Sequence, residues 1–127
     1  MDTPRQLIVI VDDEESVRRA LRRLMLSAGF RAMAFASGAE FLESLRTNRP
    51  ACIVLDLHMP TMSGFDVQQR LHDDQTRIPV VVITGHDSPE TQQRALSAGA
   101  AAYLRKPVDD QALLHAISSA IAANPGG

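Results

Sequence analysis

Apolar and polar residues follow one another along this chain in two periods, one typical of strands and one typical of helices. Residues 7–11 are five consecutive apolar residues, and the run ends at the four acidic residues 12–15. Such a run predicts a strand that is covered on both faces, as in a parallel sheet. Six apolar positions between Val17 and Ala28 then have the i, i+3, i+4 spacing of an amphipathic helix, and Gly29 is expected to end it.

The same strand and helix unit recurs four more times. Short apolar runs predict the remaining strands at residues 32–35, 52–55, 79–83 and 101–104. Five units in 127 residues leave about 25 residues for each, which suits short loops and right-handed crossovers around a parallel sheet. The sequence therefore predicts an α/β fold, a doubly wound (βα)5 flavodoxin-like sandwich whose parallel sheet has the strand order 2-1-3-4-5.

Capping residues indicate where the predicted helices begin and end. Ser37 with Glu40 has the spacing of a capping box, and we expect Pro50 to close the helix that it opens. Either Asp109 or Asp110 is expected to cap the last helix. These residues therefore mark the expected boundaries of the second and the last helix.

Composition and charge narrow the class of protein. The chain is long enough for one domain, which we expect over residues 1–123, with 124–127 as a tail or the start of a linker. The net charge of -2 offers no basic surface, so we expect this domain not to bind nucleic acid directly. The single cysteine, Cys52, fits a reducing compartment, and no apolar segment is long enough to cross a membrane. We therefore expect a cytoplasmic protein.

Charged and hydroxylic residues follow the predicted strands at their carboxyl ends. Asp12 and Asp13 follow the first strand, Asp56 the third, Thr84 the fourth and Lys106 the fifth. Open α/β sheets bind ligands outside the carboxyl ends of their strands, at the point where the strand order reverses. The first and third strands flank that point in the 2-1-3-4-5 order. We therefore expect the three aspartates to converge.

Three carboxylates in one cleft require a cation. Two of them 4 Å apart repel each other by about 4 kcal/mol at an effective dielectric constant near 20. Hard oxygen ligands suit Mg²⁺, with Mn²⁺ as an alternative, and such an ion typically binds carboxylates together with phosphate oxygens. One carboxylate can then attack phosphorus to form an aspartyl phosphate, while Lys106 and the Thr84 hydroxyl hold the phosphoryl oxygens.

These residues resemble the receiver domain of bacterial two-component response regulators, most closely its FixJ-type branch, whose members often carry a helix-turn-helix output domain. The resemblance implies that Asp56 accepts a phosphoryl group from a phosphohistidine of a sensor histidine kinase. It also implies a metal bound by Asp12, Asp13, Asp56 and the backbone carbonyl of His58. The matching segments, which together span residues 7 to about 123, are 10–14, 55–60, 62–64, 83–86 and 103–107.

The resemblance assigns roles to residues of the last two strands as well. It implies that Thr84 and Lys106 contact the phosphoryl group and that Tyr103 swings inward when Thr84 moves toward it. Static packing against the fourth helix would also explain a tyrosine at this position. The peptide bond between Lys106 and Pro107 matches one that is usually cis in the family.

Two histidines flank the expected site. His58 and His86 stand two positions after Asp56 and Thr84, where the family tunes the lifetime of the acyl phosphate. Their alternative interpretation is as solvent-facing loop residues, and they are weak candidates for Mg²⁺ ligands because this ion prefers oxygen.

The sequence therefore predicts a phosphorylation-activated signalling receiver, with no enzymatic activity beyond its own phosphorylation and dephosphorylation. Its output would be a new partner, an output domain that regulates transcription, or a homodimer through the fourth helix and fifth strand. One alternative is a phosphohydrolase with Asp56 as nucleophile, although His58 stands where such enzymes place a second aspartate. Another is an interaction module on the same fold that is not phosphorylated. The chain is either a stand-alone receiver or the front of a longer regulator.

Overall fold

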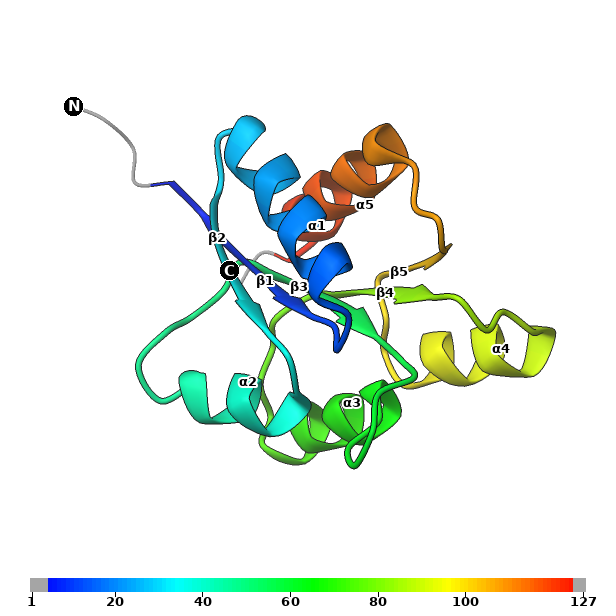
Figure 1. Ribbon diagram of the computed structural model, residues 1–127. Coiled ribbons are helices and arrows are strands. Elements are labelled where there is room, and N and C mark those ends of the chain that lie inside the picture. The colour runs from blue at the N-terminus through cyan, green and yellow to red at the C-terminus, as the bar shows by residue number, and fades with distance from the viewer. Residues whose placement is uncertain (1–4, 125–127) are drawn as a thin grey trace.

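The apolar runs form one parallel sheet at the centre of the molecule. The computed structural model describes residues 5–124, and the strands within them lie in the order β2-β1-β3-β4-β5 (Figure 1). The strands are β1 (Leu7–Val11), β2 (Arg31–Phe35), β3 (Cys52–Asp56), β4 (Val80–Thr84) and β5 (Ala102–Arg105). All residues of the three inner strands are buried, whereas the two edge strands are partly exposed. The predicted doubly wound fold and its strand order are confirmed.

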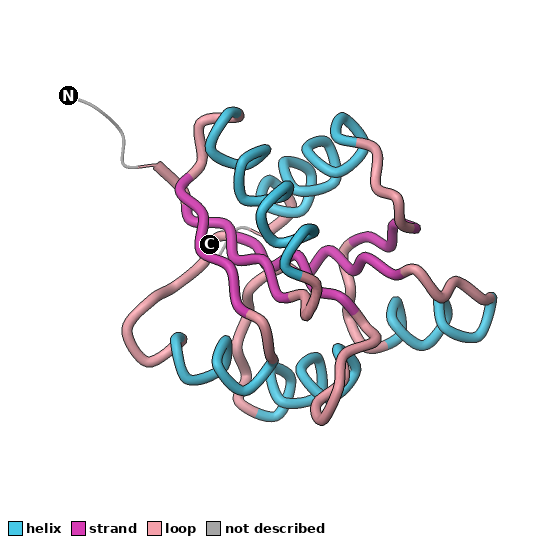
Figure 2. The backbone as a smooth tube through the Cα atoms, in the orientation of Figure 1, coloured by secondary structure: helices cyan, strands magenta, loops and turns pink. Residues whose placement is uncertain are grey.

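Helices cover both faces of this sheet. Figures 1 and 2 show α1 and α5 on one face and α2, α3 and α4 on the other. The helices are α1 (Glu15–Ser27), α2 (Gly38–Ser44), α3 (Gly64–Asp73), α4 (Pro89–Ser97) and α5 (Asp110–Ala122). Among residues 5–124, none of these helices combines the length and the apolar character needed to cross a bilayer.

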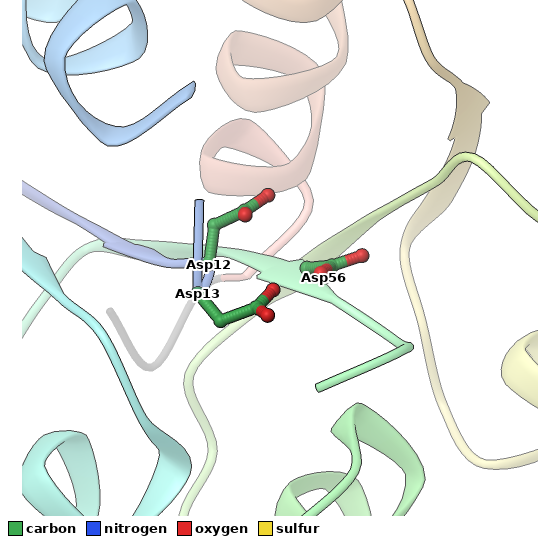
Figure 3. Close-up of side chains that lie close together, drawn as sticks. All are labelled: Asp12, Asp13 and Asp56. Atoms are coloured by element: carbon green, nitrogen blue, oxygen red, sulfur yellow. The ribbon is translucent and has the colours of Figure 1, made fainter. Parts of the chain in front are cut away.

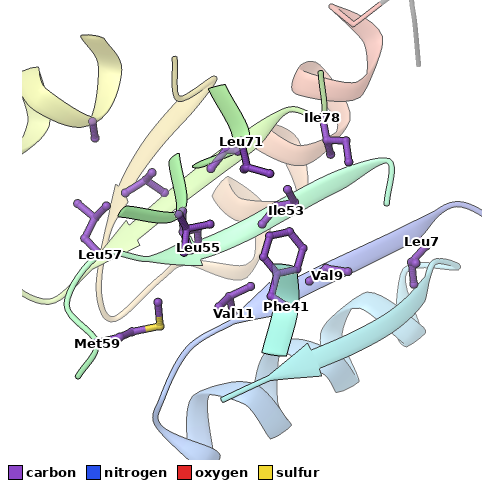
Figure 4. Packing of buried hydrophobic residues seen from close by; sticks show 14 residues of the cluster. Leu7, Val9, Val11, Phe41, Ile53, Leu55, Leu57, Met59, Leu71 and Ile78 are labelled. Carbon is purple, nitrogen blue, oxygen red and sulfur yellow. The ribbon is translucent and has the colours of Figure 1, made fainter. Parts of the chain in front are cut away.

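Side chains of the inner strands point alternately into two hydrophobic cores, because successive residues of a strand face opposite sides of the sheet. Val9 and Val11 of β1 pack on the side of α2 and α3, around the fully buried Phe41 (Figure 4). Ile8 and Ile10 pack on the side of α1 and α5. The inner strands are thus held from both faces, which fixes the positions of their carboxyl ends.

The second helix is shorter than the sequence predicts. It ends at Ser44 and does not continue toward Pro50, because the next backbone hydrogen bonds reach carbonyls only three residues back. The Asn48 side-chain amide then donates to the Ser44 carbonyl at 3.2 Å. The predicted capping box is only half formed. The Glu40 N–H donates to the Ser37 hydroxyl, whereas the Glu40 carboxylate accepts from that same hydroxyl.

A complete capping box opens α3, where the sequence analysis did not expect one. The Ser63 hydroxyl accepts from the Asp66 N–H at 3.2 Å, and the Asp66 carboxylate accepts from the Ser63 N–H at 2.9 Å. The usual signature has Glu or Gln at this position and so does not include Asp66. At α5 the cap is Asp109, whose carboxylate accepts from the Ala112 N–H at 2.9 Å.

The remaining expectations concern single residues and the carboxyl end. Gly29 follows α1 with φ of +93°, so it ends that helix as predicted. Cys52 is fully buried, and burial raises the pKa of its thiol to about 12. Of the predicted tail, only Asn124 belongs to the described residues, and its side-chain amide donates to the Arg77 carbonyl at 3.1 Å. Residues 125–127 lie outside the described part of the chain.

Candidate functional site

Three aspartates meet at the carboxyl edge of the sheet, where the sequence places them. Asp12 and Asp13 follow β1, and Asp56 is the last residue of the neighbouring strand β3 (Figure 3). One carboxylate oxygen from each residue lies within 4.8 Å of the other two. Asp12 and Asp56 are buried and Asp13 is exposed, so the cluster reaches solvent through Asp13.

Lys106 brings positive charge to this cluster. Its Nζ lies 2.8 Å from Asp12 Oδ2 and 3.5 Å from Asp56 Oδ1. It also lies 3.5 Å from Glu14 Oε1, a contact that the sequence analysis did not anticipate. Burial alone would lower the pKa of the Lys106 ammonium, but the neighbouring carboxylates, Asp12 foremost, outweigh burial and raise it. Lys106 therefore carries its charge inside the pocket.

The Asp56 carboxyl is hard to ionise in this surrounding. Burial, and then the negative charge of Asp12, raise its pKa from 3.8 to about 6. The charge of Lys106 and a backbone hydrogen bond from His58 act in the opposite direction but do not offset the first two causes. Any added cation would favour the ionised carboxylate, because opposite charge stabilises the charged form.

The donor set of the cluster fits a hard divalent cation. Asp12 Oδ2 is buried and receives no well-aligned hydrogen bond among residues 5–124; the Lys106 ammonium is its ion-pair partner. The three side chains offer carboxylate oxygens only, which are the ligands that Mg²⁺ prefers. Asp12, Asp13 and Asp56 are therefore suited to Mg²⁺ or Mn²⁺, together with an oxygen of a phosphoryl group.

Thr84 lies at the same edge, at the end of β4, with its side chain buried. Its hydroxyl is in contact with both histidines that flank the site. The ring nitrogen Nδ1 of His58 lies 3.2 Å from Thr84 Oγ1. The backbone N–H of His86 donates to the same oxygen at 3.0 Å. The two imidazole rings are exposed and lie 4.6 Å apart between centroids. Burial, and then the charges of His86 and Lys106, lower the pKa of His58, which favours its neutral form.

Tyr103 lies apart from the aspartate cluster. Its ring packs against the core beneath α4, and its hydroxyl donates to Asp87 Oδ1 at 2.7 Å on the outside of the molecule. Asp87 belongs to the loop between β4 and α4, and no motif in the sequence indicated it. Only the tertiary arrangement brings together these two residues, which are 16 positions apart.

Backbone geometry completes the pocket on two sides. The peptide bond between Lys106 and Pro107 is cis, as the resemblance implied, and the Lys106 N–H donates to the Thr84 carbonyl at 2.8 Å. On the other side α3 begins directly against the end of β3. A side chain at Gly64 would meet the Asp56 carbonyl and would place its Cβ 2.7 Å from Leu57 Cα. Only glycine allows this close approach.

One further charged residue was missed. The Arg18 guanidinium on α1 donates to the backbone carbonyl of Asp12 at 2.9 Å, and the Asp12 carboxylate itself accepts from the Glu14 N–H at 2.9 Å. These bonds hold the turn between β1 and α1 and hence the direction of the Asp12 side chain. An arginine on an amphipathic helix gives no sequence signal for such a role, because its usual position is solvated.

Known proteins share this sequence and this arrangement. The family described as response regulator receiver domain matches residues 8–118. The chain is 39% identical over 114 residues to nodulation protein W of Bradyrhizobium diazoefficiens, covering 90% of this chain and 50% of that protein. It is 38% identical over 111 residues to the transcriptional regulatory protein FixJ of Rhizobium meliloti, covering 87% and 54%.

A solved structure agrees with these sequence relatives. The crystal structure of FixJ-N matches with a TM-score of 0.87 at 35% identity, covering 95% of this chain and 97% of that one. The resemblance inferred from the motifs is therefore confirmed. This chain spans about half the length of the curated relatives that it matches.

Proposed function

The chain belongs to the response regulator receiver domain family, and we propose that it is a phosphorylation-controlled switch whose Asp56 accepts a phosphoryl group from a sensor histidine kinase. Proteins of this family serve two-component signalling and are in general signalling proteins and not catalysts. The observation that carries the proposal is the buried Asp56 carboxylate, which shares one pocket with two further aspartates and with the Lys106 ammonium.

A magnesium ion is the expected companion of this pocket, since receiver domains bind Mg²⁺ at an acidic site. We expect Asp12, Asp13, Asp56 and the backbone carbonyl of His58 to hold it, with Mn²⁺ as a substitute. When bound, the ion neutralises the repulsion among the carboxylates and the charge of the incoming phosphoryl group. The two buried carboxylates, Asp12 and Asp56, which lie together with Asp13, support this assignment.

The transfer itself needs little from the protein besides placement and charge. An Asp56 oxygen attacks phosphorus, a P–O bond forms as the P–N bond to the donor imidazole breaks, and the bonding pair leaves with the imidazole nitrogen, which takes up a proton. The Lys106 ammonium, 3.5 Å from Asp56 Oδ1, then stabilises the added negative charge. His58 and His86 at the rim are placed to influence how fast water reaches the acyl phosphate.

Thr84 and Tyr103 convert this chemistry into a signal. The new phosphoryl oxygens compete for the Thr84 hydroxyl, which His58 and the His86 N–H now contact. If the two conformers differ by a few kcal/mol, this difference in contacts is enough to shift the population. We propose that the outer face of α4 and β5 changes as a result and binds a partner or a second copy of the chain.

FixJ is named as a transcriptional regulator, and we propose that the signal of this chain also ends in control of transcription. The single cysteine, Cys52, fits a reducing compartment, and we propose that the protein is cytoplasmic.

Labelling with a small phosphodonor tests the acceptor. Acetyl phosphate or phosphoramidate with Mg²⁺ should give a hydroxylamine-labile adduct whose mass spectrum places the phosphoryl group on Asp56. Asp56→Asn should take no label, and Asp73→Asn, which changes an exposed aspartate at the end of α3, should be labelled as the wild type. Labelling of Asp56→Asn at the wild-type rate would refute the assignment. Steady turnover of phosphate esters would favour a phosphohydrolase.

Lys106 and the oligomeric state are tested with the same reagent. Lys106→Ala should still be labelled but should lose the conformational response, and an unchanged response would remove Lys106 from the switch. Sedimentation before and after phosphorylation tests the homodimer, and an unchanged sedimentation coefficient would exclude it.

A further inference from the structure

The loop of residues 85–88 connects the phosphorylation pocket with the outer face of the molecule. At its inner end the backbone N–H of His86 donates to the Thr84 hydroxyl at 3.0 Å. At its outer end the Ser88 hydroxyl oxygen accepts from the Thr91 N–H at 3.0 Å and so caps α4. Four residues therefore tie the buried threonine to the start of a helix at the β5 edge of the sheet (Figure 1).

Asp87 lies in the middle of this loop and holds a residue of the neighbouring strand. Its Oδ1 accepts from the Tyr103 hydroxyl at 2.7 Å, and its Oδ2 lies 3.7 Å from the Arg105 guanidinium. A hydrogen bond to a carboxylate is stronger than one between neutral groups. The arginine contact is exposed and contributes little by comparison.

We propose that Asp87 is a latch that holds Tyr103 in its outward position and releases it when Thr84 leaves His86. This inference rests on the proposed function, because it names the residue that connects the Asp56 pocket to the outer face. Asp87 contacts Tyr103 and Arg105 and is not part of the aspartate cluster, so it is a positioning residue.

The covalent path between the two contacts is short. Thr84 and Asp87 are three positions apart, with His86 adjacent to Asp87. Movement of the Thr84 side chain toward Asp56 must break its bond with the His86 N–H or carry that N–H along. Where the N–H follows Thr84, the next residue, Asp87, is displaced; where the bond breaks, the loop loses the contact that holds its inner end. A charged hydrogen bond of 2.7 Å tolerates little displacement. Tyr103 then loses its partner and is free to rotate.

The hydroxyl of Tyr103 is in a surrounding that opposes its ionisation. Burial, and then the hydrogen bond and charge of Asp87, raise its pKa from 10.0 to about 12. The Ser88 backbone and the Arg105 charge lower it by less than these causes raise it. Loss of the Asp87 contact should therefore be measurable as a lower pKa of the Tyr103 hydroxyl.

Tyrosine emission tests the latch before any phosphorylation. Tyr103 is the only tyrosine and the chain has no tryptophan, so the emission of the protein comes from this residue. A hydrogen-bonded carboxylate quenches tyrosine, so Asp87→Ala should raise the emission and bring the pKa of Tyr103 from about 12 part of the way toward 10. Glu90→Ala removes an exposed charge from the first turn of α4 and should change neither. Unchanged emission and an unchanged pKa in Asp87→Ala would overturn the proposal.

The labelling rate tests the coupling. With the latch removed, the conformer in which Thr84 has moved inward should be more populated, so acetyl phosphate should label Asp56 at least about fivefold faster in Asp87→Ala. Asp87→Asn, which keeps an acceptor but loses the charge, should lie between that variant and the wild type. Altered emission with a wild-type labelling rate would overturn the coupling. Failure of the wild type itself to be labelled on Asp56 would instead refute the proposed function.

Discussion

Replacing Asp56 with asparagine should make the metal-free protein more stable, although it removes the proposed acceptor. The pKa of Asp56 is raised from 3.8 to about 6 by burial and by Asp12, so its ionised form is disfavoured in the folded chain. Each unit corresponds to about 1.4 kcal/mol, which places the cost of ionisation near 3 kcal/mol. Water reaches the cluster through the exposed Asp13 and screens part of this cost, so we expect a gain of about 1 to 2 kcal/mol.

The pH dependence of this effect follows from the direction of the pKa shift. Below pH 3.8 the carboxyl is protonated in both the folded and the unfolded chain, and Asp56→Asn should differ little from the wild type. Between 3.8 and about 6 the unfolded chain loses its proton first, so the wild type loses stability as the pH rises. The full difference between the two proteins should be present above about 6.

Urea unfolding followed by circular dichroism measures this difference, because this signal follows the helices and does not depend on the single tyrosine. The curves should be recorded in EDTA at several pH values and again with saturating Mg²⁺. With Mg²⁺ the wild type should gain stability by binding the ion, and the advantage of Asp56→Asn should shrink or reverse. Asp73→Asn, at an exposed site, should stay within about 0.5 kcal/mol of the wild type. The reasoning is refuted if Asp56→Asn is no more stable than the wild type in EDTA near neutral pH.

The structure makes three further predictions. Gly64→Ala should lower the free energy of unfolding, measured in urea, by about 1 to 3 kcal/mol, because the new Cβ would lie 2.7 Å from Leu57 Cα. Gly85→Ala is the control. Its Cβ would meet nothing closer than 3.9 Å, so its stability should change less. Cys52, buried and with a pKa near 12, should not react with an aromatic disulfide reagent until urea unfolds the chain, and fast reaction of the native protein would contradict its burial. Asp109→Ala should lower the thermal midpoint by an amount equivalent to about 1 kcal/mol through loss of the α5 cap, and an unchanged midpoint would contradict a stabilising cap.

The hydrophobic pattern was sufficient to predict the sheet. A continuous apolar run requires cover on both faces, so the sequence alone assigns residues 7–11 and 52–55 to strands inside the sheet. Once the strand order is 2-1-3-4-5, residues that follow β1 and β3 must meet at one edge. The convergence of Asp12, Asp13 and Asp56 was predictable for this reason, since it depends on topology and not on the conformation of a side chain.

Helix ends were predicted less well. The α2 helix is shorter than predicted because the N–H groups of residues 45–47 donate to carbonyls three residues back. The capping box at Ser63 was not predicted because the usual sequence signature requires Glu or Gln three residues later, although an aspartate forms the same hydrogen bond. In both places local hydrogen bonds compete, and the surrounding structure decides which of them forms.

The sequence by itself determined the order of strands and helices, the two cores and the edge where the acidic residues gather, because these follow from periodicity and from the geometry of a parallel sheet. Only the tertiary structure decided that Lys106 lies closest to Asp12, that His58 contacts the Thr84 hydroxyl, and that Asp87 accepts the hydrogen bond of Tyr103. The physical reason is the distance along the chain between the residues that interact. Backbone preference and burial act on each segment by itself, whereas a hydrogen bond between distant residues forms only when two loops are fixed to within about 0.5 Å of the required positions.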